Sequence, residues 1–207
     1  MTTALLSTTY FGPIQWYQKL YHYDQILIEY HETFPKQTFR NRCLIATTQG
    51  VQALTVPVEH SSNTLHASPS TLHTIRISDH GNWRHLHWQA LQSAYGESPF
   101  FEYYEDDIRP FFTERCWEYL VDYNDAICQK MCELLDIQPQ IAPTSDYAAS
   151  VPFADFRTVI QPKHPQPDAD FQPRPYYQVY QGKHGFLPNL SILDLLFNMG
   201  PESIFFL

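Results

Sequence analysis

The sequence lacks most of the motifs by which enzymes are usually recognised. Only seven of its 207 residues are glycine, and the glycine-rich patterns that cradle phosphates do not occur. The HExxH pattern of zinc proteases and the GxSxG pattern of serine hydrolases are also missing. The four cysteines form no C-x-x-C pair, which excludes a zinc knuckle and a thioredoxin-type motif. We therefore expect neither a metal nor an organic cofactor.

Positive charge and long apolar runs are scarce as well. Thirteen basic residues stand against 22 acidic ones, for a net charge of -9. Binding to a nucleic-acid backbone needs clustered Lys and Arg, so nucleic acid is not an expected partner. No stretch approaches the ~18 apolar residues of a membrane span, and the first thirteen residues do not resemble a signal peptide. We expect a cytoplasmic protein with reduced thiols.

Apolar and aromatic residues are abundant, at 43% and 15% of the chain. A chain of this length can bury roughly 70% of its unfolded surface without a stabilising disulfide. No repeat or linker divides it, so residues 1–207 are predicted to form a single domain. The aromatic side chains indicate a dense core or a surface on which a flat ligand stacks, and a core is the favoured interpretation.

The first thirty residues predict a strand, a helix and a second strand. TALLSTTY is the first strand, the helix begins after Gly12-Pro13, and QILIEY is the second strand. Strands joined through a helix are normally parallel, and ligands bind at their carboxyl ends. The loop 9–13 is therefore a predicted site wall. The fold class is α/β, with a mixed, mainly parallel sheet flanked by helices.

The rest of the chain predicts a hairpin, several helices and a proline-rich excursion. The hairpin turns at Gln49-Gly50, and a polar loop at 60–71 leads to a third β-rich run at 72–78. Helices are expected at 83–96, capped by Asp79 or Asn82, in a segment broken at Pro110, and at 114–135. Half of the sixteen prolines fall within 139–175. That density predicts an extended segment with at most one short strand, near 157–160.

The last predicted helix spans Ser191–Asn198 and is almost entirely apolar. Ser191 is a good N-cap, and Asp194 stands where a capping box has its acid. Gly200 and Pro201 end the helix in the expected order. We predict a buried helix in which Ser191, Asp194 and Asn198 have supporting roles.

Three groups of residues are candidates for a functional site, and each also has a purely structural interpretation. An arginine can hold a carboxylate or phosphate, a histidine can act as a general base, and aromatic and amide groups can line a pocket. The groups are Arg40, Asn41 and Arg42 at a strand entrance; Trp83, Arg84 and His87 on one helical turn; and Tyr176, Tyr177 and Gln178 before the last helix. On the residues alone, a structural explanation fits each group equally well or better. The first would be charged residues clustered at a strand end, the second residues packed on a helix, and the third residues that close the edge of the core.

The order of these segments resembles the WbqC-like family of bacterial proteins. The resemblance covers nearly the whole chain and rests on the order and spacing of several short motifs. They are TTYFGPIQWYQKLYHYDQILI, Lys36, Arg40-Asn41-Arg42, LTVPV, the W-R-x-x-H pattern of Trp83 to His87, Tyr177-Gln178, and FLPNLSILDLLFNMGPES.

The resemblance implies a role in the synthesis of surface polysaccharides such as O-antigen, as a transferase of aminoacyl (glycine) or glycosyl type acting on a sugar or nucleotide sugar. The implied substrate pocket lies beside the early loop, with His87 as the catalytic base. The residues bordering it are Tyr10, Arg40, Asn41, Arg42, Trp83, Arg84, Tyr177 and Gln178.

The chain departs from the family pattern in two places. Ser7-Thr8-Thr9 replaces a family histidine, and a later family motif gives way to the proline-rich segment. These differences support the alternative hypothesis, a non-catalytic protein that binds a small molecule or acts as a scaffold.

Overall fold

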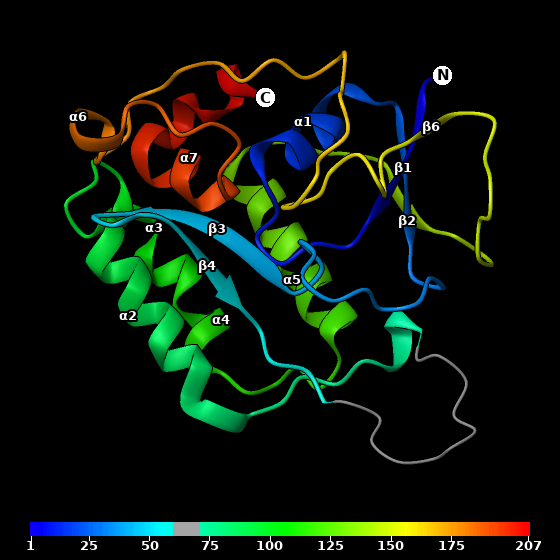
Figure 1. The fold of residues 1–207 in the computed structure, drawn as a ribbon, viewed down its shortest axis with the longest axis horizontal. Helices are drawn as coiled ribbons and strands as arrows, with labels where there is room; N and C mark the ends of the chain where they lie inside the picture. Colours follow the sequence, from blue (N-terminus) through cyan, green and yellow to red (C-terminus); the bar gives the residue numbers. More distant parts are fainter. Residues whose placement is uncertain (60–70) are drawn as a thin grey trace.

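A four-stranded parallel sheet forms one side of the molecule (Figure 1). The computed structural model describes residues 1–59 and 71–207. The strands follow the order β5-β2-β1-β6, with β1 at Thr3–Ser7 and β2 at Gln25–Glu29. Helix α1, Ile14–His22, joins β1 to β2, which pair in parallel along their whole length. The predicted strand–helix–strand unit and the α/β fold class are confirmed, and the described residues form one compact domain.

The predicted hairpin is also confirmed. Strands β3 (Arg42–Thr47) and β4 (Gly50–Thr55) pair antiparallel and lie between helices α7 and α2 in Figure 1. The strand predicted at 72–78 is wrong, because Leu72–Thr74 is a 3-10 turn and the residues after it make only isolated bridges. The polar loop predicted at 60–71 lies, apart from its last residue, outside the described residues.

Four helices follow, ending with the longest in the described chain. They are α2 (Trp83–Tyr95), α3 (Phe101–Ile108), α4 (Pro110–Thr113) and α5 (Leu120–Leu134). Helix α5 begins six residues later than predicted, because the backbone of 118–120 is extended and pairs with that of 75–77. The predicted caps of α2 are wrong: Asn82 is left-handed and makes no capping bond, and Asp79 pairs with Arg84. Within the described ranges, no helix is long and apolar enough to span a membrane.

The proline-rich segment contributes both edges of the parallel sheet. Strand β5, Ile141–Pro143, pairs with β2, and β6, Ala154–Asp155, pairs with β1. Proline is tolerated there because an edge strand has a side without a partner. The single strand predicted at 157–160 is wrong, since those residues form a turn after β6.

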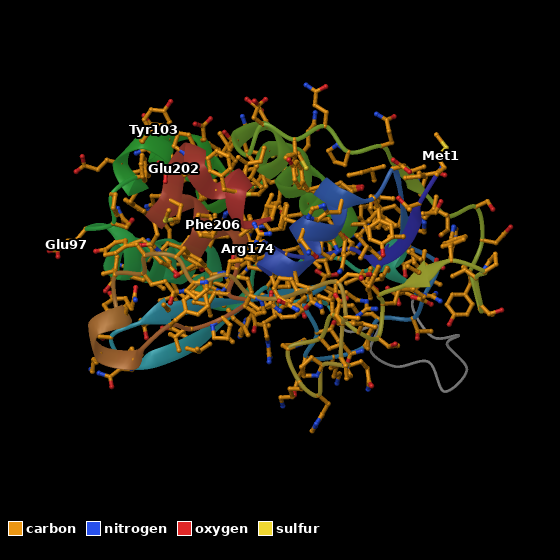
Figure 2. The ribbon with its side chains drawn as sticks, turned by 90° about the horizontal axis from the view of Figure 1, so that it is seen from above. Met1, Glu97, Tyr103, Arg174, Glu202 and Phe206 are labelled. Carbon is orange, nitrogen blue, oxygen red and sulfur yellow. The ribbon has the colours of Figure 1, made fainter. Side chains whose placement is uncertain are left out.

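Polar contacts attach the remainder of this segment to the rest of the chain. The buried Lys19 Nζ lies 2.8 Å from the carboxylate of Asp168. Further along, Arg174 donates to the carbonyl of Phe205, and Figure 2 shows Arg174 beside Phe206 near the carboxyl terminus. The short helix α6, Gln181–His184, follows.

Helix α7, Ile192–Met199, is buried on nearly all sides and continues into a 3-10 helix at Gly200–Phe206. Ser191 caps it as predicted, accepting from the N–H of Leu193. The predicted capping box is wrong, because the N–H of Ser191 donates instead to the carbonyl of Leu44 at 2.8 Å. Ser191 also donates to the carbonyl of Phe11, which attaches the early loop to α7.

Candidate functional site

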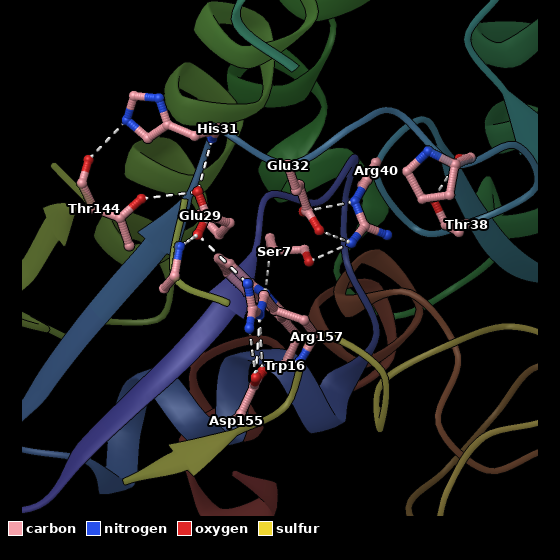
Figure 3. A network of polar contacts seen from close by, with 12 residues as sticks. Ser7, Trp16, Glu29, His31, Glu32, Thr38, Arg40, Thr144, Asp155 and Arg157 are labelled. Atoms are coloured by element: carbon pink, nitrogen blue, oxygen red, sulfur yellow. Dashed lines mark hydrogen bonds and ion pairs between the residues drawn. The ribbon is translucent and has the colours of Figure 1, made fainter. Parts of the chain in front are cut away.

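Polar side chains gather where the parallel strands end. Ser7 is the last residue of β1 and lies opposite Glu29, the last residue of β2. Asp155 ends β6, and Thr144 directly follows β5. Because all four strands run in the same direction, these residues lie together at the carboxyl-terminal edge of the sheet, where the strands end (Figure 3). This is the edge at which open parallel sheets bind ligands.

Glu29 is the centre of this network. Its side chain is fully buried, and its carboxylate accepts four hydrogen bonds (Figure 3). The donors are the N–H of His31 (2.8 Å), the hydroxyl of Thr144 (3.0 Å), the N–H of Ala148 (2.8 Å) and Nη1 of Arg157 (3.4 Å). A buried carboxylate needs such donors to offset the loss of hydration. Glu29 thus fixes β2, the 144–148 loop and Arg157 relative to one another.

Arg157 is held from two sides. Its Nε and Nη2 donate to the two carboxylate oxygens of Asp155, at 3.0 and 2.7 Å, while Nη1 faces Glu29. Burial raises the pKa of Asp155, but the hydrogen bonds from Arg157 outweigh this effect and hold the pKa below its usual range. A planar guanidinium held in this way is preorganised, so little entropy is lost when another group binds to it.

Arg40 is the corresponding cation on the other side of the β1 end. Its Nε and Nη2 contact the two carboxylate oxygens of Glu32 at 2.8 and 2.7 Å, and Nη2 also donates to Ser7 Oγ at 2.5 Å. The backbone carbonyl of Arg40 accepts from Asn124 on α5. Both arginines are therefore buried, fixed and directed at the same edge of the sheet.

A groove of about 900 Å³ lies beside this edge. Arg40, Arg157 and Lys36 line it together with the acids Glu32 and Asp155. Each arginine is paired with one of these acids, whereas Lys36 is exposed and has no ion-pair partner among the described residues. His31 and the half-exposed ring of Tyr147 complete the polar and aromatic parts of the wall. The groove therefore presents two arginines paired with acids, one lysine unpaired within the described chain, and an aromatic ring.

His31 has one ring nitrogen available. Its Nε2 lies 3.1 Å from the carbonyl of Thr144, and a carbonyl can only accept, so Nε2 carries the proton. In the neutral ring, Nδ1 is then an unprotonated acceptor. Across residues 1–59 and 71–207, no group of three or more His, Cys, Asp and Glu is placed to hold a metal ion.

Among the residues predicted for the site, only Arg40 lines this groove. Tyr10, Trp83 and His87 belong to a buried aromatic cluster at the start of α2. The hydroxyl of Tyr10 is hydrogen-bonded to Nδ1 of His87 at 2.9 Å, and burial lowers the pKa of His87 to about 4. The guanidinium of Arg84 lies 4.4 Å from the ring of Trp83. The catalytic role of His87 stays a prediction.

The other predicted residues do not line the groove either. Asn41 donates to the carbonyl of Val56, and Arg42 donates to Thr55 Oγ1 within the hairpin. Tyr177 is 53% exposed. Gln178 is buried beside α7, where it donates to Asp194.

A second buried network surrounds Asp194 on α7. One carboxylate oxygen accepts from Tyr95, and the other accepts from Tyr176 (2.5 Å) and Gln178 (2.9 Å). Asn198 donates to the backbone carbonyl of Asp194. These contacts give Asp194 and Asn198 structural roles in the core.

The sequence interpretation missed Glu29, Glu32 and Arg157. Glu29 carried a signal, because it is an acid at the end of an otherwise apolar strand. Arg157 carried less, since the strand before it is only two residues long and lies in a proline-rich segment. Their convergence depends on β6 pairing with β1, a contact between residues about 150 positions apart.

Comparison with known proteins agrees with the resemblance noted in the sequence. The model of the WbqC-like protein family matches residues 8–161, a range that includes every residue lining the groove. An uncharacterised protein of Mycobacterium tuberculosis, Rv1507c, is 25% identical over 97% of this chain and 94% of its own length. No solved structure matches significantly. Because the family model covers most of the chain, this protein belongs to the WbqC-like protein family.

Proposed function

We propose that the groove binds an anionic small molecule, a sugar phosphate or nucleotide sugar, and that the protein is a transferase acting on it in the synthesis of surface polysaccharides. The observation that carries the proposal is the convergence of Lys36, Arg40 and Arg157 on one groove at the carboxyl ends of parallel strands. Guanidinium groups bind phosphate oxygens bidentately, and an ammonium adds a mobile point charge. A groove of this size suits a ligand as large as a nucleotide sugar.

His31 is the proton acceptor in this proposal. It lines the groove, its Nε2 is oriented by the carbonyl of Thr144, and its Nδ1 is free to accept. His87, the base predicted from the sequence, has Nδ1 engaged by Tyr10 and lies outside the groove. A general base must come within hydrogen-bond reach of the proton that it removes. We therefore expect His31→Ala to abolish turnover while leaving ligand binding within a few-fold of wild type.

Calorimetric titration with a panel of uridine and guanosine diphosphate sugars tests the binding step. Lys36→Ala should weaken binding about tenfold, the equivalent of about 1.4 kcal/mol. Because Lys36 is exposed, this change leaves the fold intact. Lys183→Ala, an exposed lysine on α6 away from the groove, is the matched control. If the wild-type chain binds no member of the panel, or if the two variants bind equally well, the proposal is wrong.

A non-catalytic binding protein is the second candidate. Both arginines are already paired with acids of the chain, so their charge is partly neutralised. This favours weak binding of an anion over stabilisation of the charge that develops in a transition state. Incubation with the nucleotide sugar that binds best separates the two functions. Slow release of the free nucleoside diphosphate, lost in His31→Ala, indicates a glycosyl transferase in which water replaces the sugar acceptor. The bond from the sugar to the diphosphate breaks, the sugar bonds to the water oxygen, and His31 takes up the water proton. Binding without any release in the wild type, with or without sugar acceptors, indicates a binding protein.

A further inference from the structure

A second cavity, of about 480 Å³, lies on the α5 side of the sheet and shares no lining residue with the groove. Its apolar wall is formed by residues of α1, β2 and the segment around β5. These are Trp16, Ile28, Ile137, Ile141 and two prolines. The volume falls within the range of pockets that bind small molecules. An apolar ring or short hydrocarbon of a ligand would fit against this wall.

The polar part of the wall includes one carboxylate with an unused acceptor. Asp125 receives one hydrogen bond, from the hydroxyl of Tyr30 at 2.7 Å to Oδ1, while its Oδ2 has no partner in the described ranges. Asp125 is exposed, so a ligand can reach this oxygen from solvent.

The charge of the wall has one sign. Of the described residues that line the cavity, none is lysine, arginine or histidine, whereas Asp125 and Glu133 are acids. Glu133 is already paired with Lys130 at 2.8 Å. Asp125 makes no ion pair with any described residue. A cation entering the cavity would therefore meet one carboxylate that no cation neutralises.

We propose that this cavity is a binding site for a small primary amine with an apolar body. The ammonium would lie against Asp125, and the apolar body would pack against Trp16 and Ile28. An ammonium group has three donors and no acceptor, which matches a carboxylate with an unused oxygen. The site is separate from the groove and does not depend on the function proposed for it.

Three probes of the same size and different charge test this proposal. They are phenethylamine, 2-phenylethanol and phenylacetate, titrated against the full chain by ligand-observed NMR and calorimetry. Phenethylamine should bind, and phenylacetate should bind at least tenfold more weakly. Equal binding of the amine and the carboxylate, or no binding of the amine at millimolar concentration, would overturn the proposal.

Two variants place the binding in this cavity. Asp125→Asn should weaken phenethylamine binding at least fivefold, whereas Asp122→Asn, an exposed acid one turn earlier on α5, should leave it within twofold. Ile141→Trp fills the cavity from a position that is 41% exposed, so it should remove binding without loss of thermal stability. If both Asp125→Asn and Ile141→Trp bind the amine as the wild type does, the site is not here. Loss of nucleotide-sugar binding in Lys36→Ala with amine binding intact would show that the two sites are independent.

Discussion

His87 is a buried histidine with an engaged ring. Its Nδ1 is hydrogen-bonded to the hydroxyl of Tyr10, and burial lowers its pKa from 6.5 to about 4. Below about pH 6.5 the unfolded chain therefore takes up a proton that the folded chain excludes until about pH 4. The contribution of this residue to stability is fully present above pH 6.5 and is lost as the pH falls through that window.

The expected loss is about 3 kcal/mol across the window, because each pKa unit corresponds to about 1.4 kcal/mol. Urea unfolding at several pH values should show a steeper loss of stability below about pH 6.5 for the wild type than for His87→Gln. His85→Gln, an exposed histidine on the same helix, should behave like the wild type. Equal pH slopes for the wild type and His87→Gln would contradict the buried, neutral state described here.

Asp194 is a second residue whose role the structure changes. If Asp194 were only the acid of a capping box, its removal would lower the free energy of unfolding by about 1 kcal/mol. It instead accepts hydrogen bonds from Tyr95, Tyr176 and Gln178 in the core. Asp194→Ala leaves these donors buried without an acceptor, and we expect a loss of about 3–5 kcal/mol in the free energy of unfolding.

Ser191→Ala provides the matched comparison for Asp194→Ala. Ser191 is a true N-cap of the same helix, so its removal should cost only about 1 kcal/mol. Chemical denaturation of both variants measures the two losses side by side. A cost for Asp194→Ala no greater than that for Ser191→Ala would mean that the buried network stabilises the core little.

At the scale of helices and strands, the periodicity of apolar residues predicts the elements well, whereas the density of prolines does not. Strands β1 and β2, helix α1, the hairpin and α7 are close to the predicted positions, because each is a local pattern of apolar residues with clear start and stop residues. The segment 139–175 is predicted to be extended, with at most one strand, yet it supplies both β5 and β6. Both are short and are specified by pairing with a distant strand rather than by their own residues.

A buried ion pair attaches the proline-rich segment to helix α1. Lys19 and Asp168 are 1% and 5% exposed at the side chain, and Gln15 donates to the same carboxylate. Burial raises the pKa of Asp168, but hydrogen bonds from Lys19 and Gln15 hold it below its usual range. Asp168→Ala leaves the ammonium of Lys19 buried without a partner, which should destabilise the fold by about 3–5 kcal/mol.

Limited proteolysis should reveal the same change in the segment itself. In Asp168→Ala we expect cleavage within 161–175 to become faster, while cleavage elsewhere follows the global loss of stability. Asp170→Ala, an exposed acid two residues away, is the control and should be cut like the wild type. Unchanged cleavage and unchanged stability in Asp168→Ala would mean that other contacts hold the segment.

At the scale of the whole molecule, the sequence points to the carboxyl ends of the parallel strands, and the proposed groove lies beside these ends. The loop 9–13, predicted as a site wall, does not line the groove. Arg40 is the one predicted site residue that does, and its role stays a prediction. Tyr10, His87 and Gln178 have the chemistry of site residues, but their polar groups are engaged in the core. Tyr10 and His87 bond each other, and Gln178 bonds Tyr176 and Asp194. Burial of this kind depends on tertiary packing, which a single sequence does not display.

Hydrogen-exchange mass spectrometry with and without the nucleotide sugar that binds best is the most direct test of where ligands bind. We expect protection of backbone amides in residues 31–40 and 147–161, which form the walls of the groove. We expect no change at 83–87 or 176–178, the other segments selected from the sequence. Protection confined to those two segments, with none along the groove, would contradict ligand binding in the groove.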